Sequence, residues 1–379
     1  MNILILSEYF PESDRAEITG GVENRAFNLA RHLAKKHNVY VMTSRRPGQG
    51  KEATFSGIRV LRHGFSYEYT STGSILKRGL WCLGAILRIP WLMIKNKIAI
   101  VDGQSFFCYP AAIFSKLLGA GAHITYHETW MNNWVKNTGK KAGILGEIME
   151  RKILFLSRLL KIKVISVSNT TKRELMKYGL DSVVVPNGIN TGYYGTIKAK
   201  KTKTPSICYI GRLVEHKRVD DLLRAVSEIK KNIPDVKCRI IGDGQERKKL
   251  VSLSRKLGVE KNVVFLGYVK KCRDAIKTLK SSWVLCHPGT VEGFGIVLLE
   301  SMASRVPYVA SDIDVFREVT GNGKGGLHFR ASNYKSLAEK VMMLINDKKL
   351  YDKKITEAKF VEKYDWKKIS DGIERVYAK

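Results

Sequence analysis

Two carboxylates stand eight positions apart in the segment CHPGTVEGFGIVLLESMA, where most other residues are small or apolar. Glu292 precedes the turn formed by Gly293, Phe294 and Gly295, and Glu300 lies inside the apolar run that follows. A glycine-rich turn at a helix start presents backbone amides to a phosphate. A buried carboxylate is costly unless it is hydrogen-bonded, and the paired hydroxyls of a ribose would supply bonds to Glu300. An ion pair with an unidentified Lys or Arg is the alternative.

Two cations follow a glycine in the segment YIGRLVEHKRVDDLL. Arg212 comes directly after Gly211, and Lys217 lies five residues later, before an expected helix. Positive charge at a helix N-terminus is unfavourable against the helix dipole, which favours a functional role. Arg through its planar fork and Lys as a point charge could clamp a diphosphate. Solvated charges are the alternative.

Three other segments carry candidate chemistry. ITGGVE places Gly20 and Gly21 before the first helix, where the backbone can approach an anion closely. IIGDGQERKKL predicts a tight turn, for which a structural role and a nucleotide-side role both stay open. Asp312 and Asp314 resemble a metal-binding pair, but we expect them in a connecting loop and expect no metal to be required.

These residues must be positioned by alternating strands and helices. The pattern predicts a helix over 23–37 and strands over 2–7, 39–44, 98–101, 123–126, 163–167 and 183–185. The polar stretch 198–206 is interpreted as a linker, after which strands are expected over 206–211, 237–242, 263–267 and 283–287. This alternation indicates parallel sheets, with ligands at the carboxyl ends of the strands.

The composition constrains compartment and partners. The chain has 379 residues, room for two domains, and a net charge of +31. Its six cysteines are scattered singly, which indicates a reducing compartment, and we expect a cytoplasmic protein with neither a signal peptide nor a spanning helix. Aromatic residues are not interleaved with the basic clusters, so a nucleic-acid-binding protein is the less favoured alternative and we expect no nucleic-acid partner.

Residues 75–165 hold 14 Lys and Arg against 4 Asp and Glu. Within them, ILKRGLWCLGAILRIPWLMIKNK and MERKILFLSRLLKIK mix apolar and basic residues as interfacial helices do. One interpretation is docking on an anionic membrane at its cytoplasmic face. The other is a pair of core helices with solvated edges.

The motifs together resemble the family 4 glycosyltransferases, which are retaining enzymes dependent on sugar nucleotides. The match rests on E-x7-E at Glu292 and Glu300, on GRL followed by Lys217, and on GGVE, VPNGIN, ISVSNTTKREL and YDWKKISDGIERVY. The resemblance implies the α/β GT-B fold, with two Rossmann-like, doubly wound parallel-sheet domains facing across a cleft. They are expected at 1–190 and 191–360, with a terminal helix of about 361–379 packing back on the first.

The resemblance also implies roles for individual residues. Arg212 and Lys217 would neutralise the diphosphate, Glu300 would bind the ribose, and Glu292 would lie beside the donor sugar. His127, at a strand end in TYHETW, would contact the sugar or orient the acceptor. Backbone at glycine-rich turns would support phosphate and sugar: Gly20, Gly21, Gly211, Gly293, Phe294 and Gly295.

The expected reaction transfers a hexose, mannose or glucose, from a UDP-, GDP- or ADP-sugar to a glycan or lipid-linked acceptor in surface-glycan or glycolipid synthesis. A nucleotide-sugar epimerase of the same fold is the alternative within enzymes. The sequence departs from the family pattern at Gln245, where proline is common, and at Asn190 and Arg305, where Asp and Gly are usual.

Overall fold

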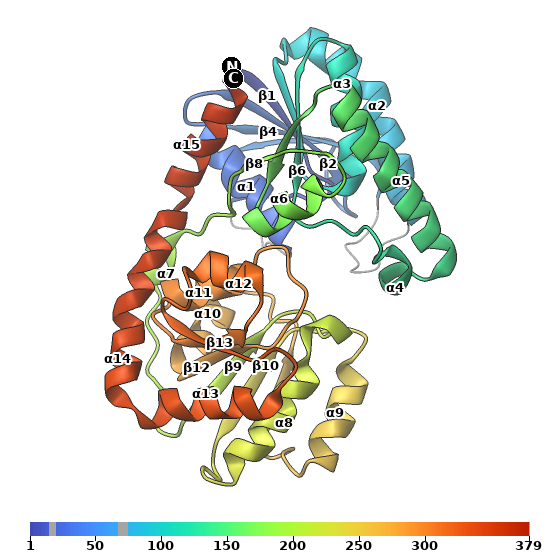
Figure 1. Ribbon diagram of the computed structural model, residues 1–379. Coiled ribbons are helices and arrows are strands. Elements are labelled where there is room, and N and C mark those ends of the chain that lie inside the picture. Colours follow the sequence, from blue (N-terminus) through green and yellow to red (C-terminus); the bar gives the residue numbers. More distant parts are fainter. Residues whose placement is uncertain (15–19, 67–74, 379) are drawn as a thin grey trace. The chain divides into compact units, whose positions relative to one another are not determined.

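The computed structural model describes residues 1–14, 20–66 and 75–378 of the chain (Figure 1). Two compact units are present. Unit 1 consists of Met1–Gly188 together with Trp366–Lys379, and unit 2 of Ile189–Asp365. Each unit is built around one sheet.

The unit 1 sheet has eight strands in the order β3-β4-β2-β1-β5-β6-β7-β8, and only the β3–β4 pair is antiparallel. Parallel strands need both faces covered, and accordingly four of the five residues of β1 are fully buried. The bounds are β1(Asn2–Leu6), β2(Asn38–Arg45), β3(Glu52–Phe55), β4(Ile58–Ser66), β5(Ile100–Gly103), β6(Gly121–Tyr126), β7(Lys163–Ser166) and β8(Val183–Val184).

Helices cover both faces of this sheet (Figure 1). Leu4 and Leu6 share a core with Trp81, Ala85 and other residues of α2, α3 and α5, whereas α1 packs with α15. The helical elements of unit 1 are α1(Gly21–Leu33), α2(Ile75–Asn96), η1(Phe106–Cys108), α3(Tyr109–Leu117), α4(Trp134–Thr138), α5(Lys140–Leu159), α6(Asn169–Met176) and α15(Trp366–Tyr377).

The unit 2 sheet has six strands in the order β11-β10-β9-β12-β13-β14, all parallel. The strand order reverses between β9 and β12, and the loops after these two strands carry the residues singled out in the sequence. A reversal of this kind is where open α/β sheets bind ligands. The bounds are β9(Ser206–Ile210), β10(Lys237–Ile241), β11(Val263–Gly267), β12(Val284–His287), β13(Tyr308–Ser311) and β14(Gly326–Phe329).

The helices of unit 2 pack by their apolar stripes. Leu222, Leu223 and Val226 of α8 share a core with Ile207 of β9 and with α13, each buried apolar side chain contributing roughly 1.5–3 kcal/mol. The helical elements are α7(Thr191–Thr196), η2(Glu215–Lys217), α8(Val219–Lys230), α9(Arg247–Lys256), α10(Cys272–Ser281), α11(Ile296–Ala303), α12(Asp314–Thr320), α13(Tyr334–Asn346), α14(Lys348–Glu357) and η3(Ala358–Tyr364).

The segment VPNGIN, residues 185–190, contains the end of the first part of unit 1. Hydrogen bonds and packing within unit 1 hold its first residues in place. Buried Arg25 donates through Nη1 to the Pro186 carbonyl at 2.7 Å and to Asn187 Oδ1 at 3.0 Å. A Cβ on Gly188 would lie 2.5 Å from the Trp366 ring, so a larger residue would displace the start of α15. The chain passes between the units after Gly188 and before Trp366.

The sequence-based expectation of two parallel-sheet α/β domains is confirmed. The antiparallel β3–β4 hairpin was not predicted. The interpretation of 198–206 as a linker was wrong, because this segment lies inside unit 2. There Thr202 N donates to Ser281 O at 2.9 Å, and Lys201 donates to the Ser282 carbonyl.

Candidate active site

The carboxylate segment forms a loop from β12 into α11 in unit 2. Gly295 precedes α11 with φ +83°, and a Cβ there would lie 2.7 Å from the Phe316 ring. Both the left-handed backbone and the lack of space require glycine at this position. Phe294 is buried, with its ring edge-on to Tyr364 at 5.8 Å. Packing at Phe294 and Gly295 therefore fixes the backbone next to Glu292 and Gly293.

Glu292 lies at the centre of a largely buried charged cluster. Its Oε1 forms an ion pair with Lys217, whose side chain is 11% exposed, and contacts His287 Nε2 at 3.1 Å. Burial alone would raise the pKa of Glu292, but the Lys217 charge and the His287 hydrogen bond hold it well below its usual range. The carboxylate is therefore ionised, and the Lys217 charge is compensated within unit 2.

Glu300 lies on the second turn of α11, where Tyr194 of α7 donates to its Oε1 at 3.1 Å. Burial raises the pKa of Glu300 to about 7, against the lowering effect of this bond. Among the described residues no cation forms an ion pair with Glu300. The alternative reading as a structural ion pair is therefore not supported.

Arg212 differs from Lys217. Its side chain is exposed, and it makes no hydrogen bond or ion pair with the described part of the chain. Gly211 is required by packing, because a Cβ there would lie 2.8 Å from Tyr209 Oη, while Tyr209 itself donates to the Arg212 carbonyl at 3.0 Å. An exposed guanidinium at a strand end retains its capacity to bind an anion.

His127 follows β6 in unit 1, as expected. Burial, assisted by the charge of Arg25, lowers the pKa of His127 to about 3, so the ring is neutral. One hydrogen bond joins it to the backbone of Gln104, and its Nε2 is buried with no partner among the described residues. A neutral ring can hydrogen-bond a hydroxyl but cannot supply a proton as an acid near pH 7.

Gly20 and Gly21 stand at the start of α1. Gly20 is the extended N-cap residue, with φ −141°, and Gly21 is the first helical residue. A Cβ on Gly21 would meet no described atom within 4 Å, so packing among the described residues does not require glycine there. A role in close approach to a ligand remains a prediction for this position.

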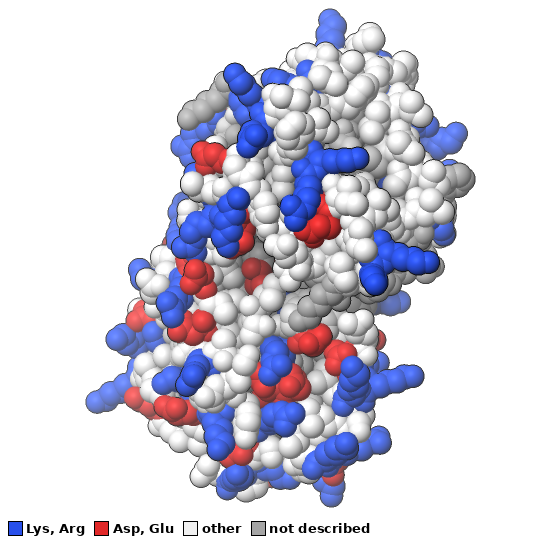
Figure 2. Space-filling model, turned by 45° about the vertical axis from the view of Figure 1, so that its right-hand side comes forward, with Lys and Arg blue, Asp and Glu red and all other residues white. Residues whose placement is uncertain are grey.

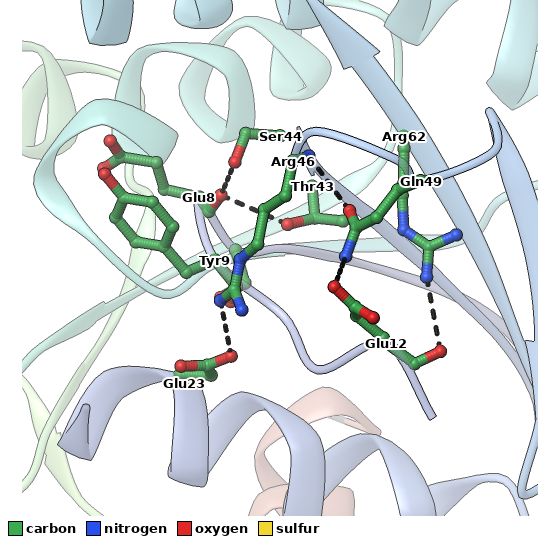
Figure 3. A network of polar contacts seen from close by, with 10 residues as sticks. Glu8, Tyr9, Glu12, Glu23, Thr43, Ser44, Arg46, Gln49 and Arg62 are labelled. Carbon is green, nitrogen blue, oxygen red and sulfur yellow. Dashed lines mark hydrogen bonds and ion pairs between the residues drawn. The ribbon is translucent and has the colours of Figure 1, made fainter. Parts of the chain in front are cut away.

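A polar network lies at the carboxyl ends of β1, β2 and β4 (Figure 3). Arg46 donates to buried Glu23 of α1 at 3.0 Å, and Gln49 donates to Glu12 at 2.8 Å. Thr43 and Ser44 both donate to the Glu8 carbonyl. The edge of the sheet where ligands bind in this class of fold therefore carries both signs of charge.

Asp312, considered in the sequence as part of a metal-binding pair, has a local partner, and so does Trp134 of α4. Asp312 binds Arg317 through both carboxylate oxygens, at 2.5 and 2.6 Å. No group of three or more His, Cys, Asp or Glu that could hold a metal ion occurs in the described ranges. Trp134 is packed against Gly146, and its Nε1 donates to Glu150 at 2.5 Å, as a packing residue does.

Sequence reasoning missed His287 and Tyr194. His287 is the last residue of β12 and lies five positions before Glu292, so its place at a strand end was a usable signal. Tyr194 lies 106 positions from Glu300 and carries no motif. The structure brings Lys217, Glu292 and His287 together, and separately Glu300 and Tyr194, all within unit 2.

The fold places the chain in a known class. A sucrose-phosphate synthase from Thermosynechococcus elongatus matches with a TM-score of 0.81 at 16% identity, covering 100% of this chain and 98% of that one. HepE from Anabaena in complex with UDP-glucose matches with a TM-score of 0.74 at 17% identity, covering 100% and 99%. The chain therefore has the GT-B glycosyltransferase fold.

Family models extend this assignment. Glycosyltransferase Family 4 matches residues 19–193, and Glycosyl transferases group 1 matches residues 196–361. The chain belongs to the group 1 glycosyltransferases of family 4. A phosphatidyl-myo-inositol mannosyltransferase from Mycobacterium leprae is 32% identical over 220 residues, covering 56% of this chain and 58% of that protein. The chain thus spans little more than half the length of this relative. The comparisons do not favour the epimerase alternative.

Proposed function

We propose that the protein transfers a hexose, mannose or glucose, from a nucleotide sugar to a hydroxyl of a glycan or lipid-linked acceptor, with retention at the anomeric carbon. The observation that carries the proposal is the arrangement in unit 2. An ionised Glu292 paired with Lys217 adjoins the turn into α11, and one turn further Glu300 offers a carboxylate with a raised pKa. UDP-glucose bound to HepE supports a nucleotide-sugar donor.

In the proposed reaction the bond from C1 of the sugar to the diphosphate breaks, and a bond from C1 to the acceptor oxygen forms. The acceptor proton leaves with a donor phosphate oxygen on the same face. Negative charge develops on the departing diphosphate, where a positioned cation is most effective. Arg212 suits this purpose, because its exposed guanidinium forms no ion pair with the described residues. Lys217 would contribute by shifting from Glu292 toward the phosphate as charge develops.

In this mechanism, side chains of the protein neutralise the charge of the diphosphate, and no resident metal is needed. His127, being neutral, would hydrogen-bond a sugar hydroxyl or the acceptor through Nε2. Glu300 would accept from the ribose hydroxyls. Each of these roles uses a group whose hydrogen-bonding capacity is incompletely filled by the described residues.

The donor can be identified with a panel of UDP-, GDP- and ADP-hexoses, measuring thermal shift first and release of nucleoside diphosphate second. We expect one base to stabilise the protein, and release to accelerate when an acceptor extract is added. Proton NMR of the product gives the anomeric configuration. An inverted product would contradict the retaining mechanism, and absence of any donor binding would contradict the function.

We also propose that unit 1 docks on an anionic membrane from the cytoplasmic side. One stripe of α2 is apolar and exposed, at spacings of three and four residues, with Leu87 80% and Ile94 82% exposed. The opposite face is buried against the sheet through Trp81, Ala85 and Ile89. A helix apolar on both faces is not a core helix with a solvated edge. The exposed stripe consists of Leu76, Leu80, Leu83, Leu87, Trp91 and Ile94.

Helix α5 adds a second exposed apolar row, made of Ile144, Leu145, Ile148, Phe155, Leu156 and Leu159. Basic residues accompany both helices, and in Figure 2 Lys and Arg side chains border broad uncharged areas of this part of the surface. Apolar side chains with a basic border fit the interface of an anionic bilayer. Among described residues, no helix combines the length and hydropathy needed to span a bilayer.

The similarity to a phosphatidyl-myo-inositol mannosyltransferase, whose name contains a phospholipid, supports a bilayer as the partner. Sedimentation with vesicles of anionic phospholipid tests it directly. Leu87→Glu with Ile94→Glu should reduce the bound fraction several-fold, since each places a charge at the interface. The matched control is Val264→Glu with Leu266→Glu, at exposed apolar positions of β11. Equal binding by both variants would contradict the docking surface.

A further inference from the structure

Lys217 and His287 both bind the same oxygen of Glu292. The ion pair with Lys217 and the 3.1 Å contact from His287 Nε2 both end on Oε1. Within the described ranges, no hydrogen bond from the protein reaches Oε2 of Glu292. The carboxylate is therefore held from one side, and its second oxygen retains its accepting capacity.

His287 is held more firmly than Lys217. The residue is 1% exposed, and its ring lies 5.0 Å from the ring of Phe316 and 6.3 Å from that of Tyr209, measured between centroids. It has two side-chain torsions, whereas the lysine stem has four and can follow a ligand. The imidazole is thus the fixed support of the carboxylate, and the lysine is the movable one.

The hydrogen-bond partners determine the tautomer of His287. Glu292 Oε1 accepts, so Nε2 carries the proton, and Nδ1 is buried with no partner among the described residues. Burial lowers the pKa of His287, against the raising effect of Glu292. A neutral ring leaves the cluster with one cation and one anion.

We infer that His287 is a positioning residue that holds the Glu292 carboxylate in place when the donor diphosphate draws Lys217 away from it. This rests on the proposed function, in which Lys217 contacts the diphosphate and Glu292 the donor sugar. The hydrogen bond from His287 matters most when the lysine has shifted, which is during transfer. Its loss should therefore affect kcat more than donor KM.

The kinetic test compares His287→Leu with His287→Gln. The leucine variant removes the N–H that donates to Glu292 and should lower kcat about tenfold, as for one hydrogen bond to a charged group. The KM for the nucleotide sugar should stay within about twofold. The glutamine amide nitrogen can occupy nearly the place of Nε2, so this variant should recover most of kcat. A leucine variant with the kcat of the wild type would overturn the inference.

Stability separates positioning from a merely structural role. Replacing His287 by Leu loses the bond from Nε2 to Glu292 but also removes the buried Nδ1, which has no described partner. These two effects on stability oppose each other, so the melting temperature should change little. The matched control is His328→Leu on β14, which loses contacts with Thr320 and Ser311 and should leave kcat unchanged. A kcat loss in step with a lowered melting temperature in both variants would overturn the inference.

A spectroscopic test does not depend on activity. Long-range ¹H–¹⁵N NMR on ligand-free protein with labelled histidine should show His287 neutral and protonated at Nε2 at pH 7, with its signals displaced in Glu292→Gln. A proton on Nδ1, or a doubly protonated ring, would overturn the inference. If His287→Leu does not fold, the glutamine variant and this spectrum decide. Failure of the wild type to use any nucleotide sugar would refute the proposed function, while the spectrum would still report the His287–Glu292 bond.

Discussion

Replacing Glu300 by Gln should make the ligand-free protein more stable at pH 8 while weakening donor binding. A carboxyl pKa raised from 4.5 to about 7 means that the ionised side chain destabilises the folded state by roughly 3 kcal/mol, at about 1.4 kcal/mol per pKa unit. Glutamine has nearly the same shape, keeps an oxygen that can accept from Tyr194, and carries no charge. It should remove this penalty.

The pH dependence gives the sign of the effect. Well below pH 4.5 the carboxyl is protonated in the folded and unfolded chains, and Glu300 contributes no penalty. Between pH 4.5 and about 7 the unfolded chain releases its proton first, so the free energy of unfolding of the wild type falls as pH rises. Above pH 7 the full penalty is present. The advantage of Glu300→Gln should therefore grow from near zero to roughly 3 kcal/mol over this window.

Urea unfolding at pH 5 and pH 8 measures this difference. Because two units can unfold separately, hydrogen exchange of the peptide containing α11 should accompany it and report the local free energy of opening. Donor affinity, measured in parallel by calorimetry, should fall about tenfold or more in Glu300→Gln, as for a lost hydrogen bond to a charged group. Identical pH dependence of unfolding in wild type and variant would refute the reasoning that Glu300 is held at a cost for ligand binding.

Arg212→Ala should leave folding unchanged, since the exposed side chain has no described hydrogen bond, and should lower kcat about tenfold or more in steady-state assays. Lys217→Ala should lower kcat and also the melting temperature, because it leaves a largely buried carboxylate without its cation; a melting temperature equal to that of the wild type would contradict this pairing. Activity should survive dialysis against EDTA, measured by release of nucleoside diphosphate, and a loss restored by Mg²⁺ would show that a metal is needed. Gly295→Ala should cost about 2 kcal/mol or more in urea unfolding, because of its positive φ and the Phe316 ring, whereas Gly21→Ala should cost little.

Local patterns were sufficient to predict the elements and their order. Continuous apolar runs such as NILIL, helical periodicity such as that of α8 and the glycines at strand ends are properties of neighbouring residues. The turn at Gly295 is also a local property, because glycine readily adopts a left-handed backbone. Arg212, Lys217 and Glu292 could also be selected, since each follows a predicted strand within one loop, and Glu300 could be selected as a carboxylate inside an apolar run. The expected start of the terminal helix near 361 was less accurate, because 358–364 forms η3 and α15 begins at Trp366.

The partners of these residues could not be read from the sequence. Lys217 and Glu292 are 75 positions apart, and only the adjacency of β9 and β12 in the sheet brings their loops together. As a result, the two cations that were predicted to bind a diphosphate differ: Lys217 is paired with Glu292, whereas Arg212 is exposed. Tyr194 reaches Glu300 from another helix. The charge state of a carboxyl depends on contacts with residues that are distant in the sequence. The direction of each pKa shift could therefore be inferred only from the tertiary structure.

The exposed stripe of α2 illustrates the same division. The sequence showed that this segment mixes apolar and basic residues, and it left open whether the segment is an interfacial helix or a core helix with solvated edges. It could not determine which apolar face is covered, because that depends on the sheet and helices packed against it. Packing buries Trp81, Ala85 and Ile89 and leaves Leu87 and Ile94 exposed. The physical reason is general: composition and period are fixed by neighbours along the chain, whereas burial and charge compensation are fixed by neighbours in space.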